Sequence, residues 1–184
     1  MNTPTLHRSN FLLHLQERAG YGEPVLLKES AHERPTRSHF DQLHNEYAIT
    51  QQLAGVAGVR PVYAKEGTES QPVLLMEYIQ GQSLAELIRT ASHDLGERLR
   101  LAVNLARVLG RVHDRGVIHK DLNSSNVLVA ERDAPGSQAG VYLIDFGLGS
   151  TSLGQRPSLL EADDSLIGSL AYVSPEQTGR MNRR

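Results

Sequence analysis

Two stretches in the second half of the chain, VIHKDLNSSNVLV (residues 117–129) and VYLIDFGLGS (residues 141–150), decide how the whole sequence is interpreted. Each is a short apolar run interrupted by polar residues, the pattern expected where a strand runs into a loop. The first places Asn126 five residues after Asp121, and the second places Asp145 24 residues after Asp121. Asp and Asn also favour turns, so neither stretch is decisive alone. Their order along the chain carries the information.

Two charged residues lie upstream of these stretches. Lys28 closes the apolar run VLLK, which predicts a strand over residues 25–28. Glu46 follows 18 residues later, within a segment over residues 40–53 whose apolar spacing predicts a helix. Taken alone, each would be an ordinary solvated residue. A Ser-Pro-Glu triplet at residues 174–176 completes the ordered set.

This ordered set resembles the signature of the eukaryotic-like Ser/Thr protein kinase family, and the resemblance extends over residues 6–184. The phrases LHNEYAIT, PVLLMEYIQGQSL, HKDLNSSN and AYVSPEQTGRMNR are similar to the N-terminal kinase-type domain of large multi-sensor signalling proteins. In those proteins an AAA-type ATPase segment, a GAF sensor and often a histidine kinase follow. The resemblance therefore implies further signalling domains in longer relatives.

The resemblance implies an α+β, protein-kinase-like fold with two lobes. Residues 1–79 would form a β-rich N-lobe with one helix, in which the first strand and the glycine-rich loop are degenerate. Residues 80–184 would form a partial helical C-lobe that carries the catalytic loop and the activation segment. The sequence pattern agrees, because strands are expected near residues 11–16, 25–28, 62–66 and 72–79 and helices at 83–92 and 95–115. Leu99, Ala102, Val103, Ala106 and Leu109 would share one apolar stripe of the longer helix.

Phosphoryl transfer depends mainly on positioning and on charge neutralisation, which gives each matched residue a role. By resemblance, Lys28 would bind the phosphates of ATP, and Glu46 would hold that lysine in place. Asp121 would orient the acceptor hydroxyl and take its proton. Asn126 and Asp145 would hold Mg²⁺, since amide and carboxylate oxygens suit this hard cation.

The same resemblance gives expectations for the adenine contact, for His119 and for phosphorylation. The backbone at Glu77 and Ile79 would bind the adenine of ATP. His119 is expected to be structural and to pack under Phe146, not to act in catalysis. Candidate phosphorylation sites lie in the activation segment, at Thr151, Ser152, Ser158, Ser165 and Ser169. By the same resemblance, Ser169 is expected to line the acceptor site instead.

The sequence also departs from the family pattern. No glycine lies in residues 6–10, where the phosphate-covering loop would fall, and Leu26 takes the place of a small residue that packs on adenine. Asn123 stands where Ser/Thr kinases usually have a lysine. The chain stops at Arg184, so we expect a kinase domain cut off after the activation segment. These departures keep a pseudokinase, a nucleotide-binding scaffold or an inactive gene fragment open as alternatives. The Ser-Pro-Glu triplet argues against another alternative, a small-molecule kinase of the aminoglycoside type.

Composition excludes several other classes. The 184 residues carry a formal net charge of -2, which predicts no electrostatic attraction to nucleic acid or to an anionic membrane. No cysteine is present, which excludes disulfides, thiolate zinc sites and a cysteine nucleophile. No His-x-x-x-His pair suggests a histidine metal site. The absence of a signal-peptide pattern and of a long apolar run predicts a cytoplasmic protein.

Overall fold

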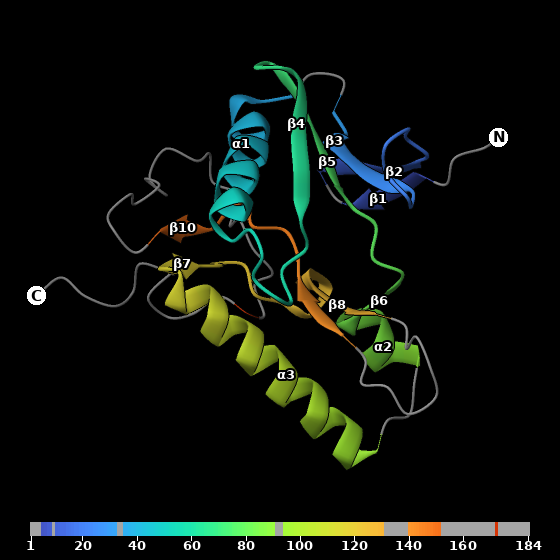
Figure 1. Cartoon of the computed structure of the whole chain (residues 1–184), viewed down its shortest axis with the longest axis vertical. Coiled ribbons are helices and arrows are strands. Elements are labelled where there is room, and N and C mark those ends of the chain that lie inside the picture. Colours follow the sequence, from blue (N-terminus) through green and yellow to red (C-terminus); the bar gives the residue numbers. More distant parts are fainter. Residues whose placement is uncertain are drawn as a thin grey trace, which may run out of the picture.

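The computed structural model describes residues 5–8, 10–32, 35–90, 94–130, 140–151 and Tyr172. A twisted sheet and one helix form the upper part of the molecule in Figure 1, and two helices with short strands form the lower part. The two parts meet where the chain leaves the upper sheet and enters the lower helices. This is the α+β, protein-kinase-like arrangement that the sequence predicts.

The upper sheet contains five antiparallel strands in the order β1-β2-β3-β5-β4. Their bounds are β1 Thr5–Arg8, β2 Phe11–Gln16, β3 Val25–Ser30, β4 Val62–Thr68 and β5 Gln71–Glu77. β1 is short, and it pairs with β2 in a register that sets Arg8 opposite Phe11. Lys28 faces Leu13 of β2 on one side and Leu74 of β5 on the other, so it sits at the centre of the sheet.

Helix α1 (Arg37–Gln52) packs against β3, β4 and β5. It begins three residues earlier than the apolar spacing predicts, because the backbone N–H of Thr36 donates to Nδ1 of His39 and fixes the first turn. Its buried Leu43 joins an apolar core made with the sheet residues Phe11, Leu13, Leu26, Val62, Leu74 and Met76. This core fixes the face of α1 that looks toward Lys28.

The lower part begins with β6 (Gly81–Ser83) and α2 (Leu84–Thr90). A capping box begins α2, since Oγ of Ser83 accepts the backbone N–H of Glu86 while Oε2 of Glu86 accepts the backbone N–H of Ser83. Further on, η1 (Ser124–Asn126), β8 (Val127–Ala130) and β9 (Val141–Leu143) carry the loop ends that form the site. β7 (Val117–Ile118) pairs with β10 (Ser150–Thr151), and β6, β8 and β9 form a small sheet.

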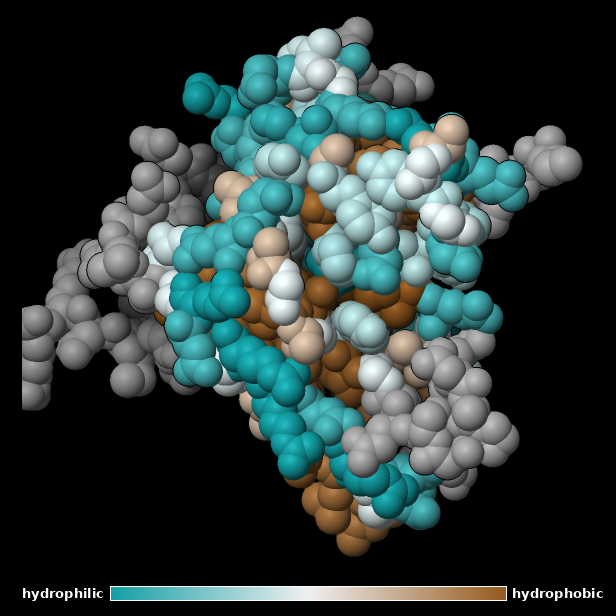
Figure 2. All heavy atoms as spheres, viewed as in Figure 1, coloured by the Kyte–Doolittle hydropathy of each residue, from teal (hydrophilic) through white to brown (hydrophobic). Residues whose placement is uncertain are grey.

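Helix α3 (Leu95–Asp114) turns a different face toward the core than the predicted stripe. Its buried residues are Val108 and Val112, with Leu101, Leu105 and Leu109 packed beside them. Of the predicted stripe only Leu109 packs inward, whereas Leu99 and Val103 are exposed. The expectation was wrong because α3 has two apolar faces, and contact with β7 and β9 decides which one is buried. Figure 2 shows the exposed apolar residues at the amino-terminal end of α3.

A second apolar core joins the two parts of the molecule. Ile49 and Leu53 at the end of α1 pack in one cluster with Val108, Val112 and Phe146. Main-chain bonds reinforce this contact, because the N–H of Leu143 donates to Gly58 at 2.8 Å and the N–H of Arg60 donates back to Leu143 at 3.2 Å. No helix in the described part of the chain is both long enough and apolar enough to cross a membrane.

Several expectations fall on positions that the structure does not describe. They include the Ser-Pro-Glu triplet at residues 174–176 and the phosphorylation sites Ser152, Ser158, Ser165 and Ser169. Thr151 is described and lies in β10.

Candidate active site

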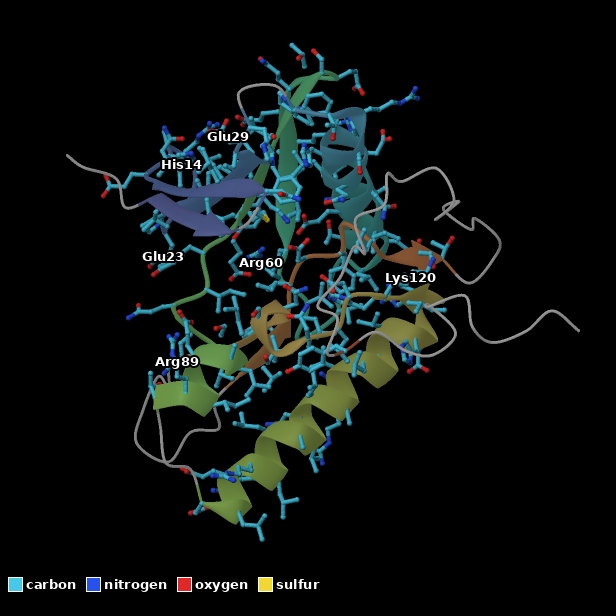
Figure 3. The ribbon with its side chains drawn as sticks, turned by 180° about the vertical axis from the view of Figure 1, so that it is seen from behind. His14, Glu23, Glu29, Arg60, Arg89 and Lys120 are labelled. Carbon is cyan, nitrogen blue, oxygen red and sulfur yellow. The ribbon has the colours of Figure 1, made fainter. Side chains whose placement is uncertain are left out.

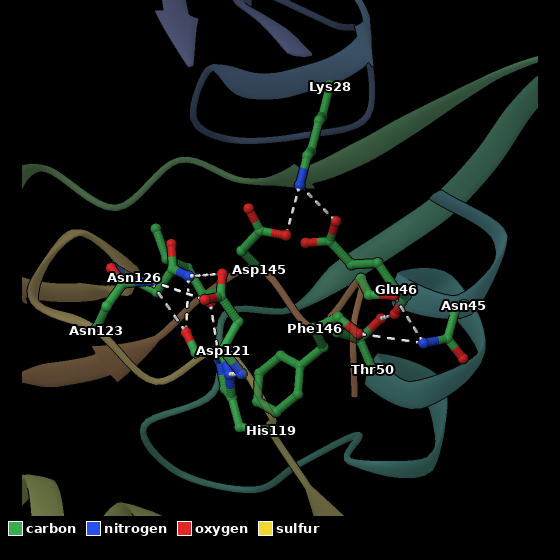
Figure 4. Close-up of polar contacts among 12 residues, drawn as sticks. Lys28, Asn45, Glu46, Thr50, His119, Asp121, Asn123, Asn126, Asp145 and Phe146 are labelled. Atoms are coloured by element: carbon green, nitrogen blue, oxygen red, sulfur yellow. Dashed lines mark hydrogen bonds and ion pairs between the residues drawn. The ribbon is translucent and has the colours of Figure 1, made fainter. Parts of the chain in front are cut away.

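Lys28 lies between two carboxylates that come from distant parts of the chain (Figure 4). Its Nζ donates to Oε2 of Glu46 at 2.7 Å and to Oδ1 of Asp145 at 3.0 Å. The ammonium also lies 4.6 Å from the ring centroid of Phe11. Lys28 comes from a central strand and Glu46 from the inward face of α1, and both are almost completely buried. The fold thus brings together three of the residues that the sequence singles out.

The charges of this cluster determine how its members ionise. Burial alone lowers the pKa of Lys28, but the carboxylates of Asp145 and Glu46 outweigh that effect and hold the pKa above its ordinary value. Burial raises the pKa of Glu46, while the charges of Lys28 and Arg60 oppose the rise. A buried ammonium with two carboxylate partners therefore stays charged at neutral pH.

His119 supports the site without facing its cavity. Its Nε2 donates to the carbonyl of Ile144 at 3.1 Å, and its Nδ1 accepts the backbone N–H of Asp121 at 3.3 Å. The ring also packs against Phe146, with centroids 4.5 Å apart. Burial lowers the pKa of His119, so the ring is neutral and ties the loop of Asp121 to the segment of Asp145. These contacts agree with the expected structural role.

Asp121 is held by two neighbouring side-chain amides. Nδ2 of Asn126 donates to Oδ2 of Asp121 at 2.8 Å, and Nδ2 of Asn123 donates to Oδ1 at 3.2 Å. The Asn126 amide group thereby turns its nitrogen toward Asp121. Its carbonyl oxygen is left as the atom that can bind a cation.

Two loops of the site have unusual backbone geometry. Asp145, after β9, adopts a φ of 67°, and Lys120, after β7, adopts a φ of 63°, values that non-glycine residues rarely adopt. Asn45 of α1 stabilises the Asp145 segment, because its Nδ2 donates to the carbonyls of Gly147 and Gly149, each at 2.9 Å. Asn45 and Glu46 are consecutive, so one turn of α1 contacts both Lys28 and the Asp145 segment. Nothing in the sequence pattern marks Asn45 for this role.

One cavity of about 560 Å³ is lined by polar residues from both the upper and the lower part of the molecule. Lys28, Asp121, Asn126 and Asp145 line it, as do Phe11, Leu13, Arg60, Ser83, Ala85, Glu86, Arg89, Asn123 and Ser125. Glu46 lies behind Lys28 and holds it from outside the cavity lining. The described residues contain no group of three or more His, Cys, Asp or Glu side chains that could bind a metal by themselves.

Sequence reasoning missed two arginines of this cavity, Arg60 and Arg89 (Figure 3). Arg60 precedes β4 and is 6% exposed, and Arg89 is exposed on α2. In the sequence, an arginine among apolar residues directly before the expected strand at residues 62–66 is a signal that could have pointed to Arg60. Conversely, Glu77 and Ile79 do not line the cavity, and the N–H of Glu77 donates to Pro61 at 3.0 Å. Their contact with adenine stays a prediction.

The family model described as protein kinase domain matches residues 15–183. Serine/threonine-protein kinase pkn2 of Myxococcus xanthus is 29% identical over 167 residues, which is 90% of this chain and 20% of that protein. KEOPS complex subunit Bud32 of Pyrococcus abyssi is 32% identical over 133 residues, or 70% of this chain and 56% of that protein. Serine/threonine-protein kinase AfsK of Streptomyces coelicolor is 36% identical over 107 residues, or 58% of this chain and 12% of that protein. The chain thus spans less than two thirds of each of these relatives.

Proposed function

This chain belongs to the protein kinase family, and from that premise we propose that it transfers the γ-phosphoryl group of ATP to Ser or Thr hydroxyls of a protein. Use of ATP and a divalent metal is what the family implies, and we propose Mg²⁺ as the metal. One observation carries the proposal. Lys28, Asp121, Asn126 and Asp145 line a single cavity although they come from separate segments of the chain.

The donor atoms in this cavity fit Mg²⁺. Asp145 supplies a carboxylate, and Asn126 supplies a carbonyl oxygen because its amide nitrogen is used by Asp121. Two protein oxygens are enough, because protein-bound Mg²⁺ keeps several waters and phosphate oxygens as its other ligands. When bound, the cation would neutralise phosphate charge during transfer.

The protein's own residues then have distinct roles. Lys28 would bind phosphate oxygens as a point charge, while Glu46 keeps the ammonium in place from the buried side. Asp121 would orient the acceptor hydroxyl and accept its proton at a carboxylate oxygen. The new bond forms between the hydroxyl oxygen and the γ-phosphorus, and the bond from that phosphorus to the bridging oxygen of ADP breaks.

The proposal also covers the boundaries of the two lobes and the location of the protein in the cell. We place the N-lobe at residues 1–79 and the C-lobe part at residues 80–184. We further propose a cytoplasmic protein whose longer relatives carry additional signalling domains.

A second function, nucleotide binding without transfer, is favoured by two specific features. In the sequence, Ser and Asn are the two residues between β1 and β2, so this stretch has no glycine that would let the backbone approach a phosphate closely. Leu26 is also buried at the strand position that faces adenine in the family. A pseudokinase would use the same cavity but would not transfer phosphate.

Thermal unfolding with nucleotide tests the proposal first. A ligand present at about 100 times its dissociation constant stabilises the folded state by roughly 2.7 kcal/mol. We expect Mg·ATP to raise the unfolding temperature, and ATP with a chelator to raise it less. Transfer is then measured with γ-³²P-ATP and dephosphorylated casein as acceptor. Binding without transfer would favour the pseudokinase, and no binding would contradict both functions.

A further inference from the structure

Asn123 occupies an unusual position for a loop residue, because it is 7% exposed and both ends of its side-chain amide are engaged. Its Nδ2 donates to the backbone carbonyl and to Oδ1 of Asp121, each at 3.2 Å. Its Oδ1 accepts the backbone N–H groups of Ser125 at 2.8 Å and Asn126 at 3.1 Å. The same side chain thus contacts Asp121 and also caps the short helix η1.

Asn126 repeats this arrangement from the other side of Asp121. Its Nδ2 donates to the backbone carbonyl of Asp121 at 2.9 Å and to Oδ2 at 2.8 Å. Each carboxylate oxygen of Asp121 therefore has its own amide donor. Rotation of the carboxylate would break at least one of these bonds, so its orientation is fixed.

A lysine at position 123, the usual residue in Ser/Thr kinases, could not replace Asn123 in this network. An ammonium only donates, so it could not accept the N–H groups of Ser125 and Asn126. An asparagine amide both donates and accepts, which allows one side chain to serve Asp121 and η1 together. The polar atoms of Asn123 therefore bind other residues of the loop that carries Asp121.

We infer that Asn123 is a positioning residue for phosphoryl transfer. It fixes the carboxylate of Asp121 toward the acceptor hydroxyl and joins that orientation to η1, which presents Asn126. The inference rests on the proposed function, because it concerns the same site. It goes beyond that function because it gives a role to the amide of Asn123, at a position where Ser/Thr kinases usually have a lysine.

Two substitutions separate the two ends of the amide. In Asn123→Ser the hydroxyl can still accept N–H groups of η1, but it is too short to donate to Asp121. In Asn123→Asp the cap is kept, but a carboxylate oxygen faces Oδ1 of Asp121. We expect kcat to fall ~10-fold in Asn123→Ser and ~100-fold in Asn123→Asp, since small misplacements of reacting groups cost about that much. The KM for ATP should change less than about twofold, because the phosphate contacts of Lys28 are kept.

Matched changes at Asn104 of α3, Asn104→Ser and Asn104→Asp, provide the control and should leave kcat unaltered. Wild-type kcat in both Asn123 variants would overturn the inference. A loss that falls entirely in the KM for ATP would also overturn it, because it would indicate a role in nucleotide binding.

A second measurement keeps the inference testable if the wild-type chain transfers no phosphate, which would count against the proposed function alone. The side-chain NH₂ signals of Asn123 and Asn126 are followed by ¹⁵N NMR in the wild type and in Asp121→Ala, or in Asp121→Asn if the alanine variant does not fold. Both signals should shift, and the signal of Asn104 should not. An unmoved Asn123 signal would overturn the inference.

Discussion

The ammonium of Lys28 lies 3.0 Å from the carboxylate of Asp145, although 117 positions separate the two residues along the chain. The same ammonium lies 2.7 Å from Glu46. One buried cation therefore links the central strand of the sheet, helix α1 and the segment after β9. This relationship connects the two parts of the molecule at the place where phosphate would bind.

Removing the charge of Lys28 should destabilise the protein more than removing the whole buried ion pair. Lys28→Met leaves the carboxylate of Glu46 buried without its cation, which is expected to cost about 3–5 kcal/mol of unfolding free energy. In Lys28→Met/Glu46→Leu both members of the buried Lys28–Glu46 pair are removed together, so stability should be partly restored. Urea unfolding measures both values. A double variant as unstable as the single one would contradict this account of the cluster.

The ionisation of Lys28 itself should not change the stability of the protein near neutral pH. The folded-state pKa of Lys28 is raised above the ordinary 10.5. Its contribution to stability is therefore fully present below 10.5 and is lost only as the pH rises through the higher folded value. In Lys28→Met, however, the buried carboxylate of Glu46 loses its cation, which raises the pKa of Glu46 further. The difference in unfolding free energy between wild type and Lys28→Met, measured in urea, should therefore shrink as the pH falls from about 9 to about 6 and Glu46 takes up a proton.

Asp121→Asn should abolish transfer while leaving the affinity for Mg·ATP nearly unchanged. A general base contributes typically ~10²–10⁴-fold to a rate, and an asparagine cannot accept the proton. Asp145→Ala should instead remove the Mg²⁺ dependence of ATP binding. Asp114→Asn, on the exposed end of α3, is the matched control. Equal transfer by Asp121→Asn and the wild type would rule out the catalytic assignment.

Acid should destabilise the protein through His119. Its neutral ring accepts one hydrogen bond at Nδ1, and a proton there would displace the N–H of Asp121. Because its pKa is lowered when folded, the unfolded chain binds more protons below the ordinary histidine value of 6.5. Stability should therefore be fully present above 6.5 and fall as the pH drops below it.

Unfolding in urea at a series of pH values from about 7.5 to 5.0 tests this prediction, with a slope of up to about 1.4 kcal/mol per pH unit for one group. His119→Gln should flatten the dependence but not remove it, because the pKa of His39 is also lowered, by burial and by His32. His113→Gln on α3 controls for the loss of a histidine. An unchanged slope in His119→Gln would exclude His119 as the source.

Two glycines before β4 should respond differently to the same substitution. Gly55 and Gly58 both adopt positive φ, 76° and 90°, so alanine at either would cost about 1–2 kcal/mol of backbone strain. At Gly58 the added Cβ would also lie 2.3 Å from Cγ2 of Val108, whereas nothing approaches Gly55 within 4 Å. Gly58→Ala should therefore lower the unfolding temperature clearly more than Gly55→Ala.

Adding Val108→Ala to Gly58→Ala should recover part of the lost stability, since it removes the clashing methyl groups. Equal unfolding temperatures for Gly55→Ala and Gly58→Ala would show that the packing of residue 58 against α3 is not limiting.

The elements that local patterns specify were predicted well. The strands at residues 11–16 and 25–28 are present as β2 and β3, although β3 extends to Ser30. The Ser83–Glu86 capping box is also present. These features depend on residues close together in sequence, and their chemistry can be recognised without knowing the fold. The face of α3 could not be predicted in the same way, because two apolar faces compete and only the partner strands choose between them.

The sequence by itself determined which chemical groups are available and in which order they occur. Lys28, Glu46, Asp121, Asn126 and Asp145 could be named because their order matches a known family. Only the tertiary structure decided that Asn45 contacts the Asp145 segment, that Arg60 lines the cavity and that Asn123 turns its amide toward Asp121. These arrangements depend on contacts between segments far apart in sequence, and on the direction of individual side chains, which no local pattern encodes.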